Sequence, residues 1–86
     1  MSDASTFQAV VERYLKGQCG ELVDSRLNYN TLAVQVRIGY GNASRLARFT
    51  TGFYSEIPND EEQILRVLEA RDVYKRILAL ANPIRN

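Results

Sequence analysis

Arginines in a predicted β-hairpin are the residues of this sequence best suited to chemistry. The stretch VQVRIGYGNASRLARF, residues 34–49, contains three arginines and no acidic residue. A guanidinium group forms paired hydrogen bonds with carboxylates and phosphates, so clustered arginines favour an anionic partner. Two tyrosines in nearby turns add aromatic surface that suits an interface. The candidate partner-binding residues are the four arginines of residues 25–55 and these two tyrosines: Arg26, Arg37, Arg45, Arg48, Tyr29 and Tyr40.

Acidic residues gather immediately after this region. Residues 56–72 contain six acids and two arginines, and four of the acids form a secondary acidic patch: Glu56, Asp60, Glu61 and Glu62. Carboxylates bind cations or basic surfaces, but their spacing here matches no calcium-binding loop. Acids also collect at helix N-termini, where the helix dipole favours negative charge. The patch therefore indicates above all the start of a helix, and a docking surface is the second interpretation.

The composition excludes most catalytic and metal sites. The chain has no histidine and one cysteine, Cys19, so it lacks the residues for Ser-His-Asp or Cys-His catalysis, the usual zinc sites and an internal disulfide. A hairpin turn explains the two glycines of GYGNAS without a phosphate-binding loop. We expect no enzymatic activity, no cofactor and no metal.

Length and composition predict one domain over residues 1–86. Hydrophobic residues make up 45% of the chain and charged residues 24%, as in folded globular proteins. The N-terminal MSDASTFQ is acidic and polar, unlike a signal peptide, and the apolar runs are too short to span a membrane. We expect a cytoplasmic protein that does not contact membranes.

Alternating apolar and polar residues predict two antiparallel strands joined at Gly41-Asn42, a turn that hairpins favour. Pairing Tyr40 with Ala43 across this turn puts three further pairs on one face, the one expected to be buried: Val36–Ala47, Val34–Phe49 and Leu32–Thr51. The opposite face takes two further pairs: Arg37–Leu46 and Arg48–Gln35. A third strand is predicted around ELVDSRL, residues 21–27, with a turn at residues 28–30. Its expected pairs are Val23–Val36 and Leu27–Leu32.

The polar face of this sheet is where the arginines are expected to meet. Arg37 and Arg48 are predicted as diagonal neighbours, within reach of one anion. Arg45 is expected near the hairpin turn and Arg26 near the opposite end. An ordinary cross-strand ion pair between Arg37 and Asp24 is the alternative, because exposed sheet faces are often this polar.

A helix is predicted before the sheet. Apolar residues three and four apart over residues 7–16 make one stripe. Ser5 and Gln8 resemble a capping box at its start, and Gly17 and Gly20 are expected to end it.

A second helix is predicted after the sheet, from a cap at Asn59 to Asn82. Its apolar stripe changes side along its length, and Arg71 falls inside the stripe. Either the helix breaks near Arg71-Asp72, with Asp72 capping a second helix, or its halves bury against different surfaces, one of them another molecule.

These elements predict an α+β fold in the order α-β-β-β-α, a three-stranded antiparallel meander covered on one face by helices. The arginine-bearing face favours a small non-enzymatic protein that docks on a larger macromolecule, above all a protein, as an inhibitor or adaptor of the phage-encoded type. One alternative is a nucleic-acid-binding module using the same face, although a net charge of +1 argues against strong phosphate binding. The other is a self-assembling subunit that forms homo-oligomers through the last helix.

Overall fold

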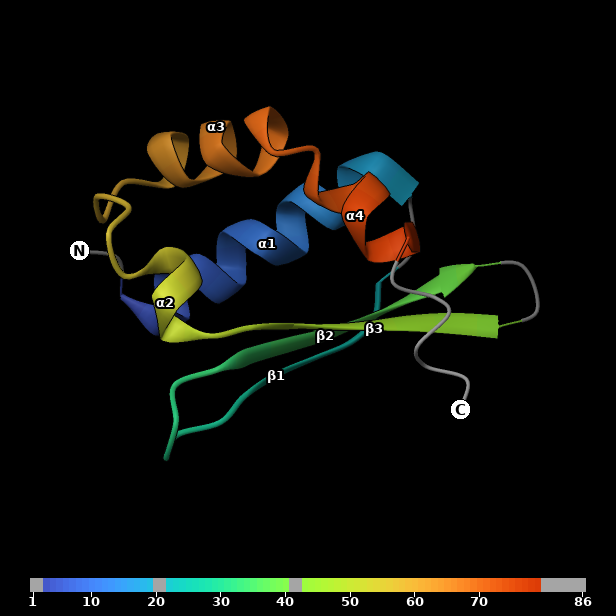
Figure 1. Cartoon of the computed structure of the whole chain (residues 1–86), viewed down its shortest axis with the longest axis horizontal. Coiled ribbons are helices and arrows are strands. Elements are labelled where there is room, and N and C mark those ends of the chain that lie inside the picture. The colour runs from blue at the N-terminus through green and yellow to red at the C-terminus, as the bar shows by residue number, and fades with distance from the viewer. Residues whose placement is uncertain (1–2, 20–21, 41–42, 80–86) are drawn as a thin grey trace.

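The sheet and the helices form two layers, with the helices on one face of the sheet (Figure 1). The computed structural model describes residues 3–19, 22–40 and 43–79. In chain order the elements are α1 (Ala4–Cys19), β1 (Leu22–Leu27), β2 (Val34–Tyr40), β3 (Ala43–Phe49), α2 (Thr51–Tyr54), α3 (Glu61–Ala70) and α4 (Val73–Ala79). The strands form an antiparallel meander in the order β1-β2-β3. The predicted α+β fold, with helices covering one sheet face, is therefore confirmed.

The β2–β3 hairpin has the register predicted from its sequence. The confirmed pairs are Tyr40–Ala43, Val36–Ala47, Val34–Phe49, Arg37–Leu46 and Gln35–Arg48. The predicted turn at Gly41-Asn42 lies outside the described residues. The predicted Leu32–Thr51 pair is wrong, because the ladder ends at Val34 and Phe49 and Thr51 begins a helix.

β1 pairs with β2 two residues away from the predicted register. The observed pairs include Ser25–Val36 and Leu27–Val34, in place of the predicted Val23–Val36 and Leu27–Leu32. A shift of two residues preserves the alternation of a strand, so Ser25 and Leu27 keep their predicted face. The prediction was therefore wrong about the partners and right about the faces of these two residues.

The loop between β1 and β2 explains this shift. The Asn28 N–H donates to the Ala33 carbonyl at 2.9 Å, and the Asn28 side chain accepts from the N–H groups of Asn30 and Thr31 at 2.8 and 3.2 Å. These hydrogen bonds close a loop of residues 28–33, which is longer than the predicted turn of residues 28–30.

Asp3 is the residue before α1, and its carbonyl accepts the Phe7 N–H at 2.9 Å, so the predicted capping box at Ser5 is wrong. The hydroxyls of Ser5 and Thr6 donate to the Asp3 carboxylate at 3.2 and 3.3 Å, so Ser5 lies inside the helix. The Gln8 amide donates to the Ser25 hydroxyl on β1 at 2.8 Å instead of reaching back to the helix start. This bond satisfies a polar serine on the helix-covered face of the sheet.

Two segments are more helical than the sequence predicts. α1 continues through Gly17, and the second predicted stop, Gly20, lies outside the described residues. The alternation of residues 45–53 predicts a strand to the end of that range, but the chain turns into α2 directly after Phe49 and Thr50. Packing against α1 takes precedence over the local alternation here.

The last predicted helix is broken at Arg71-Asp72, as one of the two alternatives proposed. Asp72 has a positive φ of 53°, and its carbonyl accepts the Arg76 N–H at 3.2 Å to open α4. Its carboxylate forms an ion pair with Lys75 at 3.7 Å rather than a side-chain cap. The break lets both halves bury their stripes in one core: Ile64 and Leu68 from α3, and Val73 and Ile77 from α4. The predicted end at Asn82 lies outside the described residues.

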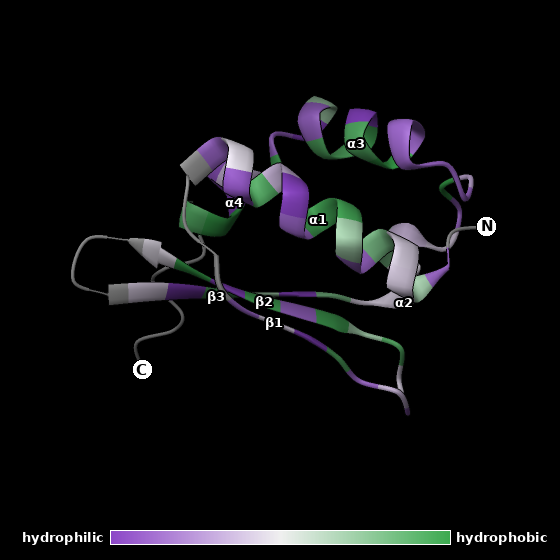
Figure 2. Cartoon of the chain, turned by 180° about the vertical axis from the view of Figure 1, so that it is seen from behind, coloured by the Kyte–Doolittle hydropathy of each residue, from purple (hydrophilic) through white to green (hydrophobic). Residues whose placement is uncertain are grey.

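The core lies between the helices and the covered face of the sheet. Phe7 of α1 is completely buried; its ring stacks on Tyr54 at 4.4 Å and meets Phe49 edge-on at 5.5 Å. The apolar residues of α1 and α3 lie on the sides that face the interior (Figure 2). Within residues 3–19, 22–40 and 43–79, no helix covers the other sheet face.

Candidate functional site

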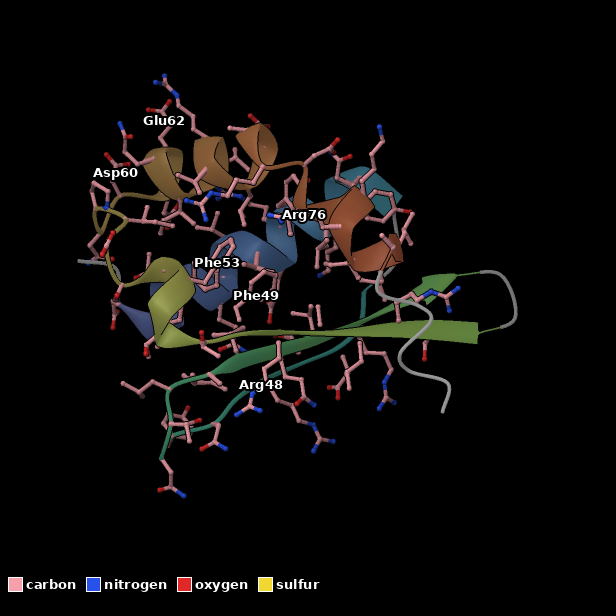
Figure 3. The ribbon with its side chains drawn as sticks, viewed as in Figure 1. Arg48, Phe49, Phe53, Asp60, Glu62 and Arg76 are labelled. Carbon is pink, nitrogen blue, oxygen red and sulfur yellow. The ribbon has the colours of Figure 1, made fainter. Side chains whose placement is uncertain are left out.

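The outer face of the sheet, the face turned away from the helices, gathers three of the candidate arginines. Arg26 of β1 pairs with Gln35 of β2, which pairs in turn with Arg48 of β3, so these residues form one row across the sheet. Arg37 lies in the neighbouring row, between Asp24 and Leu46. Figure 3 shows Arg48 on this outer side, with Phe49 on the helix side of the same strand. The predicted diagonal placement of Arg37 and Arg48 is therefore confirmed.

One acidic side chain shares this face among the described strand residues. The Asp24 carboxylate accepts from Nε of Arg26 at 3.0 Å, along the strand. It lies opposite Arg37 in the ladder, but no ion pair joins those two residues in the described structure. The alternative that Asp24 neutralises Arg37 is therefore wrong in its pairing. Arg37 and Arg48 are exposed on the open face, where their guanidinium groups are accessible to an anion.

A hollow of about 410 Å³ lies at the loop end of the outer face. Its lining comes from β1, β2, β3 and the β1–β2 loop: Arg26, Leu27, Asn28, Ala33, Gln35 and Arg48. Two guanidinium groups beside an amide can hold a carboxylate or a phosphate through several charge-assisted hydrogen bonds. The geometry suits recognition of an anionic group.

Arg45 does not belong to this face. It pairs with Ile38, and it shares its side of β3 with Ala47 and Phe49, which face the helices. Its Nη1 donates to the Ser44 carbonyl at 3.4 Å. The prediction that places Arg45 on the same face as the other arginines is wrong, because the period of two in a strand separates it from Arg48.

The two candidate tyrosines have different outcomes. Tyr29 lies at the tip of the β1–β2 loop and is 83% exposed, at the end of the sheet that holds the hollow. Tyr40 ends β2 in a pair with Ala43, but its side chain lies outside the described residues.

The secondary acidic patch builds the start of α3. The Asp60 carboxylate, rather than the predicted Asn59, caps this helix by accepting the Glu62 N–H at 2.9 Å. Glu61 accepts from Arg13 of α1 at 3.3 Å, and Glu56 is exposed before the cap. Figure 3 shows Asp60 and Glu62 at the N-terminal end of α3, far from Arg48. The cap at Asp60 and the helix dipole account for Asp60, Glu61 and Glu62, in line with the first interpretation of the sequence, whereas Glu56 lies outside the helix.

A second hollow, beside β3, was not predicted. It has a volume of about 390 Å³ and lies between β3, α2 and α4, lined mainly by Phe49, Phe53, Val73 and Ile77. The sequence did not indicate this hollow, because its alternation predicts a strand that continues to residue 53. Phe53 reaches the hollow only when the chain turns into α2. The change of side in the last helix was the available signal, since the break brings Val73 and Ile77 over β3.

The fold and the site together define a small α+β domain with one open, arginine-bearing sheet face. Comparisons of the chain with protein-family models, curated proteins and solved structures found no match. Within the described residues, no group of histidine, cysteine and acidic side chains is placed to hold a metal ion. No helix in the same part of the chain is long and apolar enough to cross a membrane.

Proposed function

We propose that this chain is a small, non-enzymatic, cytoplasmic binding protein whose outer sheet face docks on an acidic surface of a larger protein, as an inhibitor or adaptor. One observation supports this above the others. Arg26, Arg37 and Arg48 come from three adjacent strands and meet on a sheet face that no helix of the described chain covers.

A protein partner suits this face better than a nucleic acid. Leu46, 38% exposed, lies opposite Arg37 and offers an apolar contact among the arginines. Interfaces between proteins are enriched in arginine and depleted of lysine. Strong nucleic-acid binding depends on neutralising many phosphates, and three arginines beside Asp24 supply few such contacts.

Self-assembly through the last helix has less support. That alternative required one half of the apolar stripe of the last helix to stay exposed for contact with another molecule. The break at Arg71-Asp72 instead turns Val73 and Ile77 inward, where they are 3% and 2% exposed.

Capture of partners by charge-reversed variants tests the proposal. The wild type, Arg37→Glu with Arg48→Glu, and a control with Lys16→Glu and Arg66→Glu would each be immobilised and exposed to nuclease-treated extract of the source cells. The control makes the same change in net charge at exposed residues of α1 and α3. We expect at least one protein to be retained by the wild type and the control, and to bind the outer-face variant about tenfold less tightly or worse.

Two results would contradict the proposal. One is a captured set that is the same for the wild type and the outer-face variant. The other is binding that is absent from the nuclease-treated extract but appears when nucleic acid is added, which would assign the face to nucleic acid instead.

A further inference from the structure

We infer that the free edge of β3, together with the apolar hollow beside it, binds an extended segment of a partner protein as a fourth strand, with apolar and acidic residues alternating along that segment. This inference rests on the proposed function in taking the partner to be a protein. Beyond the proposed function, it names the edge of β3 as the surface that the partner binds, and it gives the sequence pattern of the partner segment.

β3 is an edge strand of the described sheet. Among the described strands it pairs with β2 alone, and it does so regularly over all seven residues. Its sequence, ASRLARF, contains no proline or lysine, and its inward-pointing charge, Arg45, lies outside the Ala47–Phe49 segment that lines the apolar hollow. The opposite edge differs, because the register of β1 shifts between Leu22 and Asp24. A regular edge segment without proline or a bulge is a template for adding another strand.

The apolar hollow follows this edge. Three consecutive residues of β3 line it: Ala47, Arg48 and Phe49. Neighbouring residues of a strand point to opposite faces, so a hollow that touches all three runs along the backbone edge. Val73 and Ile77 of α4 form its far wall, and Phe53 of α2 lies beside it. Figure 3 shows Phe49 and Phe53 on the helix side of β3, with Arg76 above them.

The charges around the hollow select an acidic occupant. Arg48 lines it from the outer side of the sheet, and Arg76 lines it from α4. Arg71 lies over the Phe53 ring, 5.2 Å from its centre. None of the described residues that line the hollow is acidic. Within the described chain, neither Arg48 nor Arg76 forms an ion pair.

The geometry of an added strand turns these observations into a sequence pattern. Its side chains alternate between the two sheet faces. Those on the helix side enter the apolar hollow over Phe49 and Ile77. Those on the other side reach Arg48 and then Arg37, one strand further in. Apolar residues are therefore expected at one set of alternate positions and acidic residues at the other.

A displayed library of random peptides of about ten residues is the first probe, selected against the immobilised wild-type protein. We expect enriched sequences in which apolar and acidic residues alternate over about four positions or more. Failure to enrich any sequence, or enrichment of sequences without this alternation, would overturn the inference.

Synthetic copies of the enriched peptides test the two structural elements separately. Arg76→Glu should weaken their binding about tenfold or more, while the matched control Arg66→Glu, exposed on α3, should leave it unchanged. N-methylation at alternate peptide positions removes hydrogen-bond donors. Only the set facing β3 should matter, again by about tenfold. Equal effects of the two N-methylated sets, or no effect of Arg76→Glu, would contradict strand addition at this edge.

The variant Arg26→Glu separates this inference from the proposed function: Arg26 belongs to the outer face but lies on β1 and does not line the apolar hollow, so this variant should leave peptide binding unchanged. Selection of alternating peptides together with no partner captured through the outer face would overturn the proposed function and support the edge site. The reverse result would overturn the edge site alone. A dimer in sedimentation equilibrium that the peptides cannot dissociate would assign the edge to a second copy of the chain and also overturn the inference.

Discussion

Tyr54 joins α2 to the β1–β2 loop through a single hydrogen bond. Its hydroxyl donates to the Leu32 carbonyl at 2.5 Å, and its ring stacks on Phe7 inside the core. Burial, and secondarily the negative charge of Asp3, raises the pKa of Tyr54 above its ordinary value. Tyr54 therefore links α2, α1 and the β1–β2 loop, and its hydrogen bond to Leu32 requires the protonated hydroxyl.

Tyr54→Phe should lower the free energy of unfolding by about 1 kcal/mol at neutral pH, because the Leu32 carbonyl loses its donor. Because the folded pKa is raised, the stability contributed by the neutral phenol is fully present below the unfolded pKa of about 10 and is lost as pH rises through the folded value. Urea unfolding at a series of pH values measures this. The wild type should lose stability above about pH 10 more steeply than Tyr54→Phe; parallel curves for the two proteins would contradict the assignment.

Leu32 has a backbone conformation that its side chain disfavours. Its φ is 61° and its side chain is 43% exposed. We expect Leu32→Asn to stabilise the protein by about 1 kcal/mol, since asparagine tolerates the left-handed region and the Tyr54 bond uses only the carbonyl. Thermal unfolding should show a rise in Tm of about 4–8 °C. Leu46→Asn, an exposed strand position, is the control and should give no rise.

At the scale of elements, the break between α3 and α4 determines what the last third of the chain buries. A straight helix would direct Ile64 and Val73 to different sides, because their positions are far apart around a helix of 3.6 residues per turn. The turn at Asp72 redirects α4 over β3, and it creates one wall of the apolar hollow. The hollow therefore exists because this helix is interrupted.

Substitutions at Asp72 should act in opposite directions. Asp72→Val should destabilise the protein by about 1 kcal/mol or more, because a β-branched residue strongly disfavours positive φ. Asp72→Gly should be neutral or stabilising by up to about 1 kcal/mol, because glycine adopts this region freely. Chemical unfolding compares the two, and Lys75→Ala controls for the exposed ion pair, which contributes little. Equal effects of valine and glycine would show that backbone conformation is not what Asp72 supplies.

At the scale of the whole molecule, a small core holds two layers together, and no helix of the described residues covers the outer face of the sheet. Phe7 lies where the layers meet, in contact with the rings of Phe49, Phe53 and Tyr54. The helices cover the inner face, so Arg37 and Arg48 of the outer face stay exposed. Arg48 of this face and the acidic residues at the start of α3 lie on separate surfaces (Figure 3).

Phe7→Ala should cost about 3–5 kcal/mol, through lost apolar burial and the cavity left behind. For a domain of this size, that is a large part of the total stability, so α1, β3 and α2 should loosen together. Phe53→Ala, at the half-buried rim, should cost only about 1–2 kcal/mol. Chemical unfolding and amide hydrogen exchange measure both variants. Similar costs for the two would contradict the central place of Phe7.

The sequence by itself determined the local pairings and the faces of the elements. Strand alternation and a two-residue turn specified the β2–β3 register, because a shift of one residue would expose Phe49. The same reasoning placed Arg37 and Arg48 on one outer face. Sequence reasoning was wrong about Arg45 for a related reason, since its nearness to the turn was weighed above the alternation that turns it toward the helices.

Only the tertiary structure decided where alternation stops and which surfaces meet. The β1–β2 register depended on hydrogen bonds of Asn28 within its loop, and a two-residue shift leaves the pattern of apolar residues unchanged. The end of β3 depended on packing of α2 against α1, and the apolar hollow on the direction of α4 after Asp72. These features arise from contacts between segments far apart in the chain, whose free energy exceeds the weak local preferences that a sequence pattern records.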